Sequence, residues 1–347
     1  MSAVILYITD KGRTLAEKLR VFYPDARIGR FSTEKVAASW TETRTFIFIM
    51  AAGIAVRTIA PLLADKRTDP AVVVLDEAGK FAVSLLSGHL GGANERAREI
   101  AGFLGGKAVI TTASDVNTLP PLDLWARDNN LVIEDWDLLP HLGTRFLDNG
   151  ALRVYADVDM ELPDEFLRVG EPRFADLLIT ARLDAYKEQC MPGMNCGPDS
   201  CRVKGQLYLR PKNLFVGIGC NKGTPEEEIQ EMVQETLRTN NLAFSSIHCL
   251  ATITLKASEE GLLAFAQKYT LDIQAFSPEM LNSVQGIARS EAVFRATGAN
   301  AVAGPAALMA AGASGLPARL LVQKQKKGNV TVAVAWYDTL NKKEDCV

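Results

Sequence analysis

Several features that would set a chain apart from ordinary globular proteins are missing here. No stretch approaches the ~20 consecutive apolar residues of a transmembrane helix. The apolar run at residues 3–8 is too short for a signal-peptide core and lacks a basic leader. Six cysteines, unevenly spread over 347 residues, do not form a disulfide framework. We therefore expect a cytoplasmic protein in a reducing compartment.

An excess of charge of one sign is also lacking. The formal net charge is −3, and no long basic run is present. Nucleic acids and anionic membrane surfaces attract a basic field, so neither is an expected partner. Apolar residues make up 48% of the chain and charged residues 23%, the proportions of a globular protein.

The length exceeds the roughly 250–300 residues at which a single core stops growing, so two or three domains are expected. Short apolar runs alternate with helical patterns, which predicts mostly parallel sheets covered on both faces. The expected fold class is α/β, with two open, mostly parallel α/β domains joined by a smaller α/β middle domain. The expected ranges are 1–120, 121–210 with a cysteine-rich loop, and 211–338, followed by a polar tail at 339–347.

The segment Ser87–Asn94 (SGHLGGAN) joins a predicted strand to a predicted helix. Its glycines permit close approach of the backbone to a ligand, and free amides at a helix start favour a carboxylate or phosphate. His89 can move a proton near neutral pH. A glycine-rich connector with a structural histidine fits the spacing equally well. We favour a ligand site because ligands of open α/β sheets bind at the carboxyl ends of strands.

Basic residues follow an earlier predicted strand. Arg57 lies one turn into a helix that starts near Gly53, and Lys66 follows the end of that helix. Both are candidate clamps for carboxylates, which arginine can bind in a bidentate way. Solvated surface charge is the ordinary alternative for each residue taken alone.

A second glycine-rich loop, residues 217–224 (GIGCNKGT), follows another predicted strand. Thr224 and Glu227 have the spacing of a capping box around Pro225, which predicts a helix start. The loop resembles a dinucleotide fingerprint, but its third glycine is one place late, so nucleotide binding is a minor alternative. Anion binding by free amides beside Lys222 is the favoured interpretation.

Three cysteines, Cys190, Cys196 and Cys201, form a cluster that Cys220 could join. Thiolates this close could hold zinc or an iron–sulfur cluster, but the usual C-x-x-C pair is missing. A reduced surface loop is the favoured interpretation. His141 and His248 have no visible partners and are expected to be structural.

Taken together, these segments resemble the cobalt-precorrin-5A hydrolase family of anaerobic cobalamin biosynthesis. One pattern departs from the family: Gly304-Pro305 stands where a glutamate is expected before an alanine-rich helix. The matching stretches cover most of the chain outside residues ~120–210, and they are residues 53–76, 85–94 (LLSGHLGGAN), 109–115 (VITTASD), 217–223 (GIGCNKG), 251–256 and 330–335.

The resemblance implies a reaction. Water opens a δ-lactone on ring A of a cobalt-containing macrocycle, and the extruded carbon with its methyl group leaves as acetaldehyde, giving cobalt-precorrin-5B. His89 would be the catalytic base, with the amides of Gly91 and Gly92 as oxyanion donors. The substrate-binding residues would be Gly53, Arg57, Lys66, Ser87, Gly88, Gly91, Gly92, Asn94, Thr111, Thr112, Gly217, Gly219, Lys222 and Gly223.

Cobalt would arrive inside the substrate, so no protein-bound metal or cofactor is expected. The expected partner is the tetrapyrrole substrate, with a homodimer and transient contacts to neighbouring pathway enzymes as further expectations. Two alternatives stay open: a non-catalytic carrier of corrinoid intermediates that uses the same loops, and a nucleotide-dependent transferase.

Overall fold

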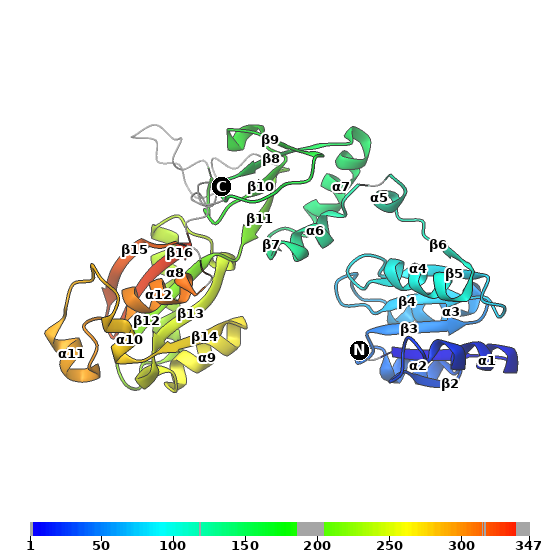
Figure 1. Cartoon of the computed structure of the whole chain (residues 1–347), viewed down its shortest axis with the longest axis horizontal. Helices are drawn as coiled ribbons and strands as arrows, with labels where there is room; N and C mark the ends of the chain where they lie inside the picture. The colour runs from blue at the N-terminus through cyan, green and yellow to red at the C-terminus, as the bar shows by residue number, and fades with distance from the viewer. Residues whose placement is uncertain (1–2, 118, 186–204, 314, 316, 338–347) are drawn as a thin grey trace. The chain divides into compact units, whose positions relative to one another are not determined.

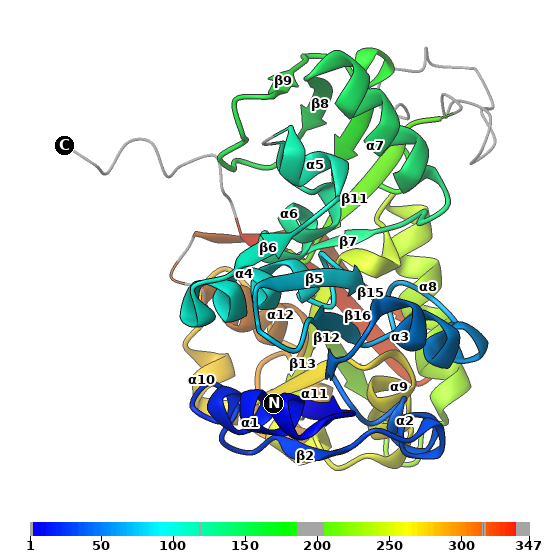
Figure 2. The ribbon, with the colours of Figure 1, turned by 90° about the vertical axis from the view of Figure 1, so that its right-hand side faces the viewer.

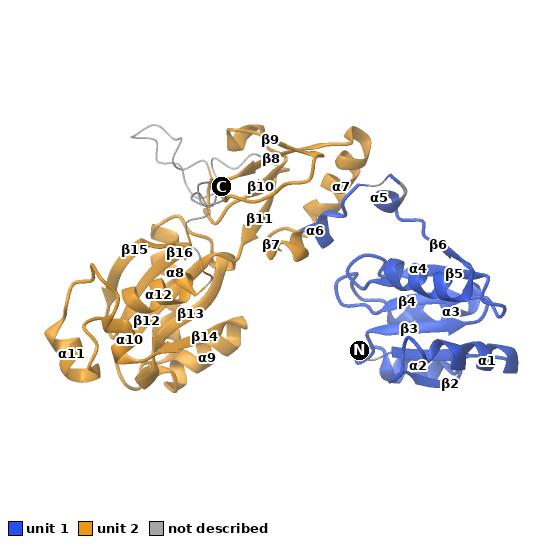
Figure 3. Cartoon of the chain, in the orientation of Figure 1, with its two compact units in different colours: residues 1–125 blue, residues 126–347 orange. Residues whose placement is uncertain are grey.

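A computed structural model describes residues 3–117, 119–185, 205–313, 315 and 317–337 (Figure 1). The chain divides into two compact units, residues 1–125 and 126–347 (Figure 3). The cysteine-rich loop and the polar tail lie outside the described residues. No helix in the described part of the chain is both long enough and apolar enough to cross a membrane.

The first unit is a six-stranded sheet in the order β2-β1-β3-β4-β5-β6. Alternate strand residues face opposite sides, and both sides are buried under helices. Ile47 and Val73 face α1 and α4, whereas Phe46 and Val72 face α2 and α3. The elements are β1 (Ala3–Tyr7), α1 (Asp10–Leu19), β2 (Arg27–Arg30), α2 (Thr33–Ser39), β3 (Thr45–Ile49), α3 (Ala52–Ile59), β4 (Ala71–Leu75), β5 (Phe81–Leu86), α4 (Ala93–Leu104), β6 (Lys107–Val109) and α5 (Ala113–Val116).

One hairpin changes the direction of the sheet. Strands β1, β3 and β4 are parallel, but β5 pairs antiparallel with β4, so that Leu86 lies opposite Val72. Strand β6 is parallel to β5. Helix α4 returns across β5 and β6 (Figure 2). The ends of β5 and β6 therefore lie at the edge where β3 and β4 begin.

The second unit contains two five-stranded sheets. The first has the order β7-β11-β10-β8-β9 and the second the order β14-β13-β12-β16-β15. The elements up to β11 are α6 (Leu122–Asp128, which crosses the division between the units), β7 (Leu131–Ile133), α7 (Leu138–Asn149), β8 (Leu152–Ala156), β9 (Phe166–Arg168), β10 (Leu177–Ile179) and β11 (Leu207–Pro211). The remaining elements are β12 (Leu214–Cys220), α8 (Glu226–Thr239), β13 (Ile247–Ile253), α9 (Glu260–Tyr269), β14 (Asp272–Phe276), α10 (Pro278–Asn282), α11 (Glu291–Thr297), α12 (Ala303–Gly312), β15 (Ala318–Lys327) and β16 (Val330–Tyr337).

These sheets confirm the predicted α/β class and its mostly parallel pairing. The polar composition of residues 324–329 is typical of a connection, but most of these residues belong to a strand. Strand β15 continues to Lys327, and only Gly328 and Asn329 turn before β16. The helix start predicted near Pro225 is confirmed, because α8 begins at Glu226, but the predicted capping-box contact is wrong. The hydroxyl of Thr224 donates to the carbonyl of Asn221, and helix α8 has no side-chain cap.

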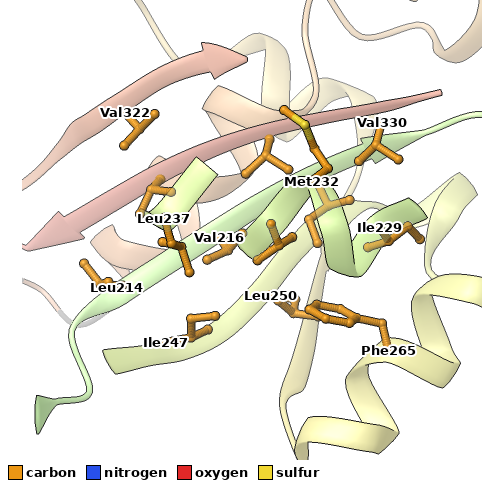
Figure 4. Packing of buried hydrophobic residues seen from close by; sticks show 14 of the residues in the cluster. Leu214, Val216, Ile229, Met232, Leu237, Ile247, Leu250, Phe265, Val322 and Val330 are labelled. Carbon is orange, nitrogen blue, oxygen red and sulfur yellow. The ribbon is translucent and has the colours of Figure 1, made fainter. Parts of the chain in front are cut away.

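One core of the second unit lies between the last sheet and helices α8 and α9. Val216 and Leu250 from the sheet pack against Ile229 and Phe265 from the helices (Figure 4). On the opposite face, the alanine-rich helix α12 covers the same sheet. Helix α12 approaches so closely that a Cβ atom at Gly217 would overlap the carbonyl oxygen of Ala303.

Replacing Gly217 with alanine should therefore destabilise the second unit, because overpacking a filled core costs about 1–3 kcal/mol. Gly143 in α7 provides a matched control, since its Cβ position meets open space. Alanine there should stabilise the helix by roughly 0.5–1 kcal/mol. Urea unfolding of both variants measures the two effects. Unchanged stability of the Gly217 variant would contradict the close packing of α12.

Candidate functional site

His89 lies between two carboxylates of the first unit. Its Nε2 atom lies 3.0 Å from Asp115 Oδ2, and its Nδ1 atom lies 3.6 Å from Asp123 Oδ1. The first distance is that of a hydrogen bond, whereas the second is that of a looser ion pair. The side chain of His89 is 17% exposed and each carboxylate 15%. The group is therefore shielded from solvent without being sealed off.

Asp115 makes the most hydrogen bonds and ion pairs in this group. Its Oδ2 also accepts a hydrogen bond of 2.8 Å from Asn94 Nδ2, and its Oδ1 pairs with Arg98. The same Asn94 nitrogen donates to Thr112 Oγ1 at 3.1 Å. Because α4 supplies Asn94 and Arg98 while α5 supplies Asp115, the group ties these two helices together.

The two carboxylates change the charge that His89 carries. The carboxylate of Asp123, assisted by that of Asp115 and opposed by burial, raises the pKa of His89 above its ordinary value of 6.5. Burial opposes the shifts of the partners, but Arg98 and His89 lower the pKa of Asp115, and His89 lowers the pKa of Asp123. The geometry therefore favours an imidazolium between two ionised carboxylates.

The loop that carries His89 closes on itself. The amide of Gly92 donates to the carbonyl of His89 at 2.8 Å, and the next two amides donate to the carbonyls of Ser87 and Gly88. The prediction of free amides at this helix start was therefore wrong for Gly92 and the two residues after it. Among the described residues, the amide of Gly91 has no such partner, and it remains a candidate donor.

Packing within the loop explains its glycines. A Cβ atom at Gly88 would lie 2.6 Å from Asn94 Oδ1, and one at Gly91 would lie 2.7 Å from the carbonyl oxygen of Ser87. Gly92 has a φ of +81°, in the left-handed region that favours glycine. These residues make the loop compact and thereby orient His89.

The loop follows the carboxyl end of β5, as predicted, but because β5 is antiparallel to β4 this is the edge at which β3 and β4 begin. The hydroxyl of Ser87 donates to the carbonyl of Asp69, just before β4, at 3.0 Å. Gly53, by contrast, follows the end of β3, and the guanidinium of Arg57 lies beside it. Since a five-residue strand spans ~17 Å, Gly53 and Arg57 belong to the opposite edge from His89.

Other predicted residues lie on the same side as His89. Both carboxylate oxygens of Asp69 accept the amide of Ala64, at 3.1 and 3.2 Å, which shapes the turn that carries the exposed Lys66. Thr111 and Thr112 follow the end of β6, and only Thr112 contacts the group, through Asn94.

A second candidate site is a cavity of about 460 Å³ in the second unit. Four lysines line it, from the loop after β12, the turn after β13 and the strand β15, and none of its lining residues is acidic. Its apolar lining comes mainly from α11 and the start of α12. The lysines are Lys222, Lys256, Lys324 and Lys326, and the apolar residues are Ile253, Ala292, Val293, Ala296, Ala301, Val302 and Ala303.

Two of the four lysines, Lys324 and Lys326, have no carboxylate partner among the described residues, whereas Lys222 interacts electrostatically with Glu259. Lys256 pairs with Glu259 at 2.9 Å, and the other oxygen of Glu259 accepts the amide of Gly223 at 2.9 Å. The first turn of α8 carries three glutamates, which oppose an anion at that helix start. Positive charge here therefore comes from side chains and not from the expected free amides.

The remaining predicted residues of this loop divide in two. Gly219 and Lys222 line the cavity, whereas Gly217 and Gly223 are not among its lining residues. Gly217 is buried under α12, so packing accounts for that glycine. Gly304 is also buried, with Ile287 and Leu320 in ordinary contact distance of its Cβ position.

Cys190, Cys196 and Cys201 lie outside the described residues, so the role of the cysteine-rich loop stays a prediction. Cys220 is buried at the cavity, and burial raises the pKa of its thiol. In the described ranges, no three His, Cys, Asp or Glu residues are grouped so that they could hold a metal ion.

Sequence reasoning missed Asp115, Asp123 and Arg98, and in the second unit Lys256, Lys324 and Lys326. Asp115 lies within the stretch VITTASD, which was quoted for the resemblance without a role for its acid. The two lysines of β15 alternate with Gln325, which is the period of a strand face. That alternation was the signal that could have placed them together.

The chain matches two family models, Cobalamin synthesis G N-terminal over residues 34–115 and Cobalamin synthesis G C-terminus over residues 214–335. It is 37% identical to a cobalt-precorrin-5A hydrolase from Priestia megaterium, over 83% of this chain and 77% of that protein. It is 32% identical to a cobalt-precorrin-5A hydrolase from Salmonella typhimurium, over 88% of this chain and 91% of that protein. Protein CobE from Sinorhizobium sp is 32% identical over 37% of this chain and 82% of its own length.

His89, Arg98 and Asp115 lie within the N-terminal match, and the lysine-lined cavity lies within the C-terminal match, whereas Asp123 lies beyond residue 115. Both family models describe proteins of cobalamin synthesis. The chain belongs to the cobalt-precorrin-5A hydrolase family.

Replacing Asp123 with asparagine should destabilise the first unit more at about pH 5.5 than at about pH 9. The pKa of His89 is raised in the folded protein, so the ion pair contributes its full stability below the ordinary value of 6.5 and loses it as pH rises through the folded value. Asp123, whose pKa is lowered, stays ionised over this range. Urea unfolding at the two pH values tests this, and an equal loss at both would mean that folded His89 carries no charge.

Proposed function

We propose that this protein hydrolyses the ring A lactone of cobalt-precorrin-5A and releases acetaldehyde to give cobalt-precorrin-5B. The observation that carries the proposal is the group around His89, in which the histidine of the segment SGHLGGAN lies between the carboxylates of Asp115 and Asp123. Membership of a family of hydrolases supports the reaction class. Lactone opening needs the proton transfers that such a group supplies.

The proposed reaction has two parts. The oxygen of water adds to the lactone carbonyl, and the ring C–O bond breaks to give a carboxylate and an alcohol. The alcohol then loses its proton, the bond from its carbon to the macrocycle breaks, and acetaldehyde leaves. The electron pair of that bond stays on the macrocycle carbon, which takes up a proton. His89 is the proposed proton-transfer residue, and the amide of Gly91 is a candidate donor to the oxyanion.

The lysine-lined cavity is suited to the substrate class. A cobalt-precorrin carries acetate and propionate carboxylates around an apolar ring, and the cavity combines four lysines with an apolar lining. Lysine ammonium groups bind carboxylates through charge-assisted hydrogen bonds. Cobalt would enter as part of the substrate, and we propose no metal or cofactor held by the protein. Cytoplasmic location, a homodimer and contacts with neighbouring pathway enzymes stay predictions.

A second candidate function is binding of corrinoid intermediates without turnover, which the cavity alone would support. An assay for acetaldehyde with cobalt-precorrin-5A separates the two functions, since a carrier binds the macrocycle but releases nothing. Nucleotide transfer is disfavoured, because the glutamates Glu226, Glu227 and Glu228 occupy the helix start where phosphates would bind.

Replacing His89 with alanine should lower the rate of acetaldehyde release at least ~100-fold, the low end for a general acid–base residue. His141, exposed on α7 in the other unit, provides the matched control, and its alanine variant should keep the rate. Thermal unfolding of each variant checks that it is folded. Near-normal release by the folded His89 variant would remove His89 from the mechanism.

Replacing Lys324 and Lys326 together with glutamine should raise KM about 10-fold or more, because two charge-assisted contacts are lost while kcat stays close to its original value. Lys327 is the control on the same strand. It pairs with Glu231 and Glu235, both at 2.7 Å, and is not among the residues that line the cavity. An unchanged KM in the double variant, or an equal rise in the Lys327→Gln variant, would contradict substrate binding in the cavity.

A further inference from the structure

The two nitrogens of the His89 ring are held unequally. Nε2 faces the carboxylate of Asp115, which has three partners. Besides His89, Asp115 accepts a hydrogen bond from Asn94 and pairs with Arg98. Nδ1 faces Asp123 at 3.6 Å, beyond hydrogen-bond distance. Asp123 Oδ1 also accepts the amide of Leu124 at 3.0 Å. The Nε2 end is therefore held by a hydrogen bond, whereas the Nδ1 end is held only by a looser ion pair that a substrate oxygen could replace.

We propose that Asp115 is the positioning residue of a proton-transfer dyad, and that Nδ1 of His89 is the atom that exchanges a proton with the substrate. The inference rests on the proposed function. A carboxylate only accepts, so Nε2 must carry a hydrogen toward Asp115 in both charge states of the ring. The hydroxyl oxygen of Ser114, 3.2 Å from Nε2, can accept from the same N–H.

This arrangement sets the order of the proton transfers. Charged His89 first donates its Nδ1 proton to the lactone oxygen as the C–O bond breaks, while both protons of the attacking water pass to solvent. Neutral His89 then takes the proton back from the same hydroxyl as the C–C bond breaks. Acetaldehyde leaves, and the macrocycle carbon takes one proton from solvent. His89 ends charged, and one proton is released overall with the new carboxylate.

The groups that face His89 have separate effects in this scheme. Asp115 from α5 fixes the ring, and Arg98 from α4 neutralises Asp115. Asp123 from α6 favours the charged ring until a substrate oxygen takes its place at Nδ1. Loss of Asp115 should therefore impair geometry, whereas loss of Asp123 should change the pH at which His89 is charged.

The kinetic test compares Asp115→Asn and Asp123→Asn in the full chain. Asp115→Asn should lower kcat at least ~100-fold with little change in KM, because the amide no longer holds the ring in one tautomer. Asp123→Asn should move the alkaline limb of the kcat profile to lower pH, since His89 must be charged to act as the first acid. Glu95→Gln, on the exposed face of α4, removes the same charge and should change neither quantity.

A second test reads the ring without any substrate. The chain has only three histidines, so ¹⁵N spectra of histidine-labelled protein, assigned with His89→Gln, can resolve His89. At high pH the neutral ring should be the Nε2–H tautomer in the unmodified protein and a mixture in Asp115→Asn. The signals of His141 and His248, both in the other unit, are internal controls.

An Nδ1–H tautomer in the unmodified protein, or an unchanged kcat in folded Asp115→Asn, would overturn the proposal. So would an alkaline limb that stays in place in Asp123→Asn while the NMR titration of His89 shifts. Absence of acetaldehyde from the unmodified protein would instead defeat the proposed function. The proton order would then fall with it, while the tautomer measurement would still decide whether Asp115 positions the ring.

Discussion

The antiparallel pairing of β4 with β5 decides which side chains can meet His89. It places the end of β5 beside the start of β4, and the parallel strand β6 then brings Asp115 to the same edge. In a fully parallel sheet, the loop after β5 would instead lie beside the end of β3, where Gly53 and Arg57 are found. Because of this one hairpin, His89 is surrounded by two carboxylates and is not close to Arg57.

Two ionised carboxylates this close repel each other, and cations between and beside them offset the repulsion. His89 lies between Asp115 and Asp123, and Arg98 contacts Asp115 from its other side. When it is charged, His89 therefore offsets the repulsion between the carboxylates that α5 and α6 bring together. The glycines let the loop pack closely against the side chains of its own residues. The ring of His89 is therefore already ordered before a substrate binds.

The sequence was sufficient for what depends on local pattern. Strand and helix periods predicted the α/β class, and SGHLGGAN identified His89. The sequence did not predict which strands pair or in which direction, because the direction of β5 relative to β3 depends on tertiary contacts. The same limit hid the partners of His89, which are 26 and 34 residues away along the chain. Lys324 and Lys326 were missed for a related reason, since a polar connection and an exposed strand edge look alike in composition.

The two candidate sites differ in the charge they can offer. Around His89, two carboxylates balance His89 and Arg98, so this group has no net positive charge with which to attract an acidic ring. The cavity of the second unit has four lysines and no acid in its lining. In the proposed function, the lysines of the cavity are therefore the candidates for carboxylate recognition, and His89 is the candidate for proton transfer. If lysines bind the carboxylates of the substrate, Nδ1 of His89 stays available for proton transfer, while Nε2 stays engaged with Asp115.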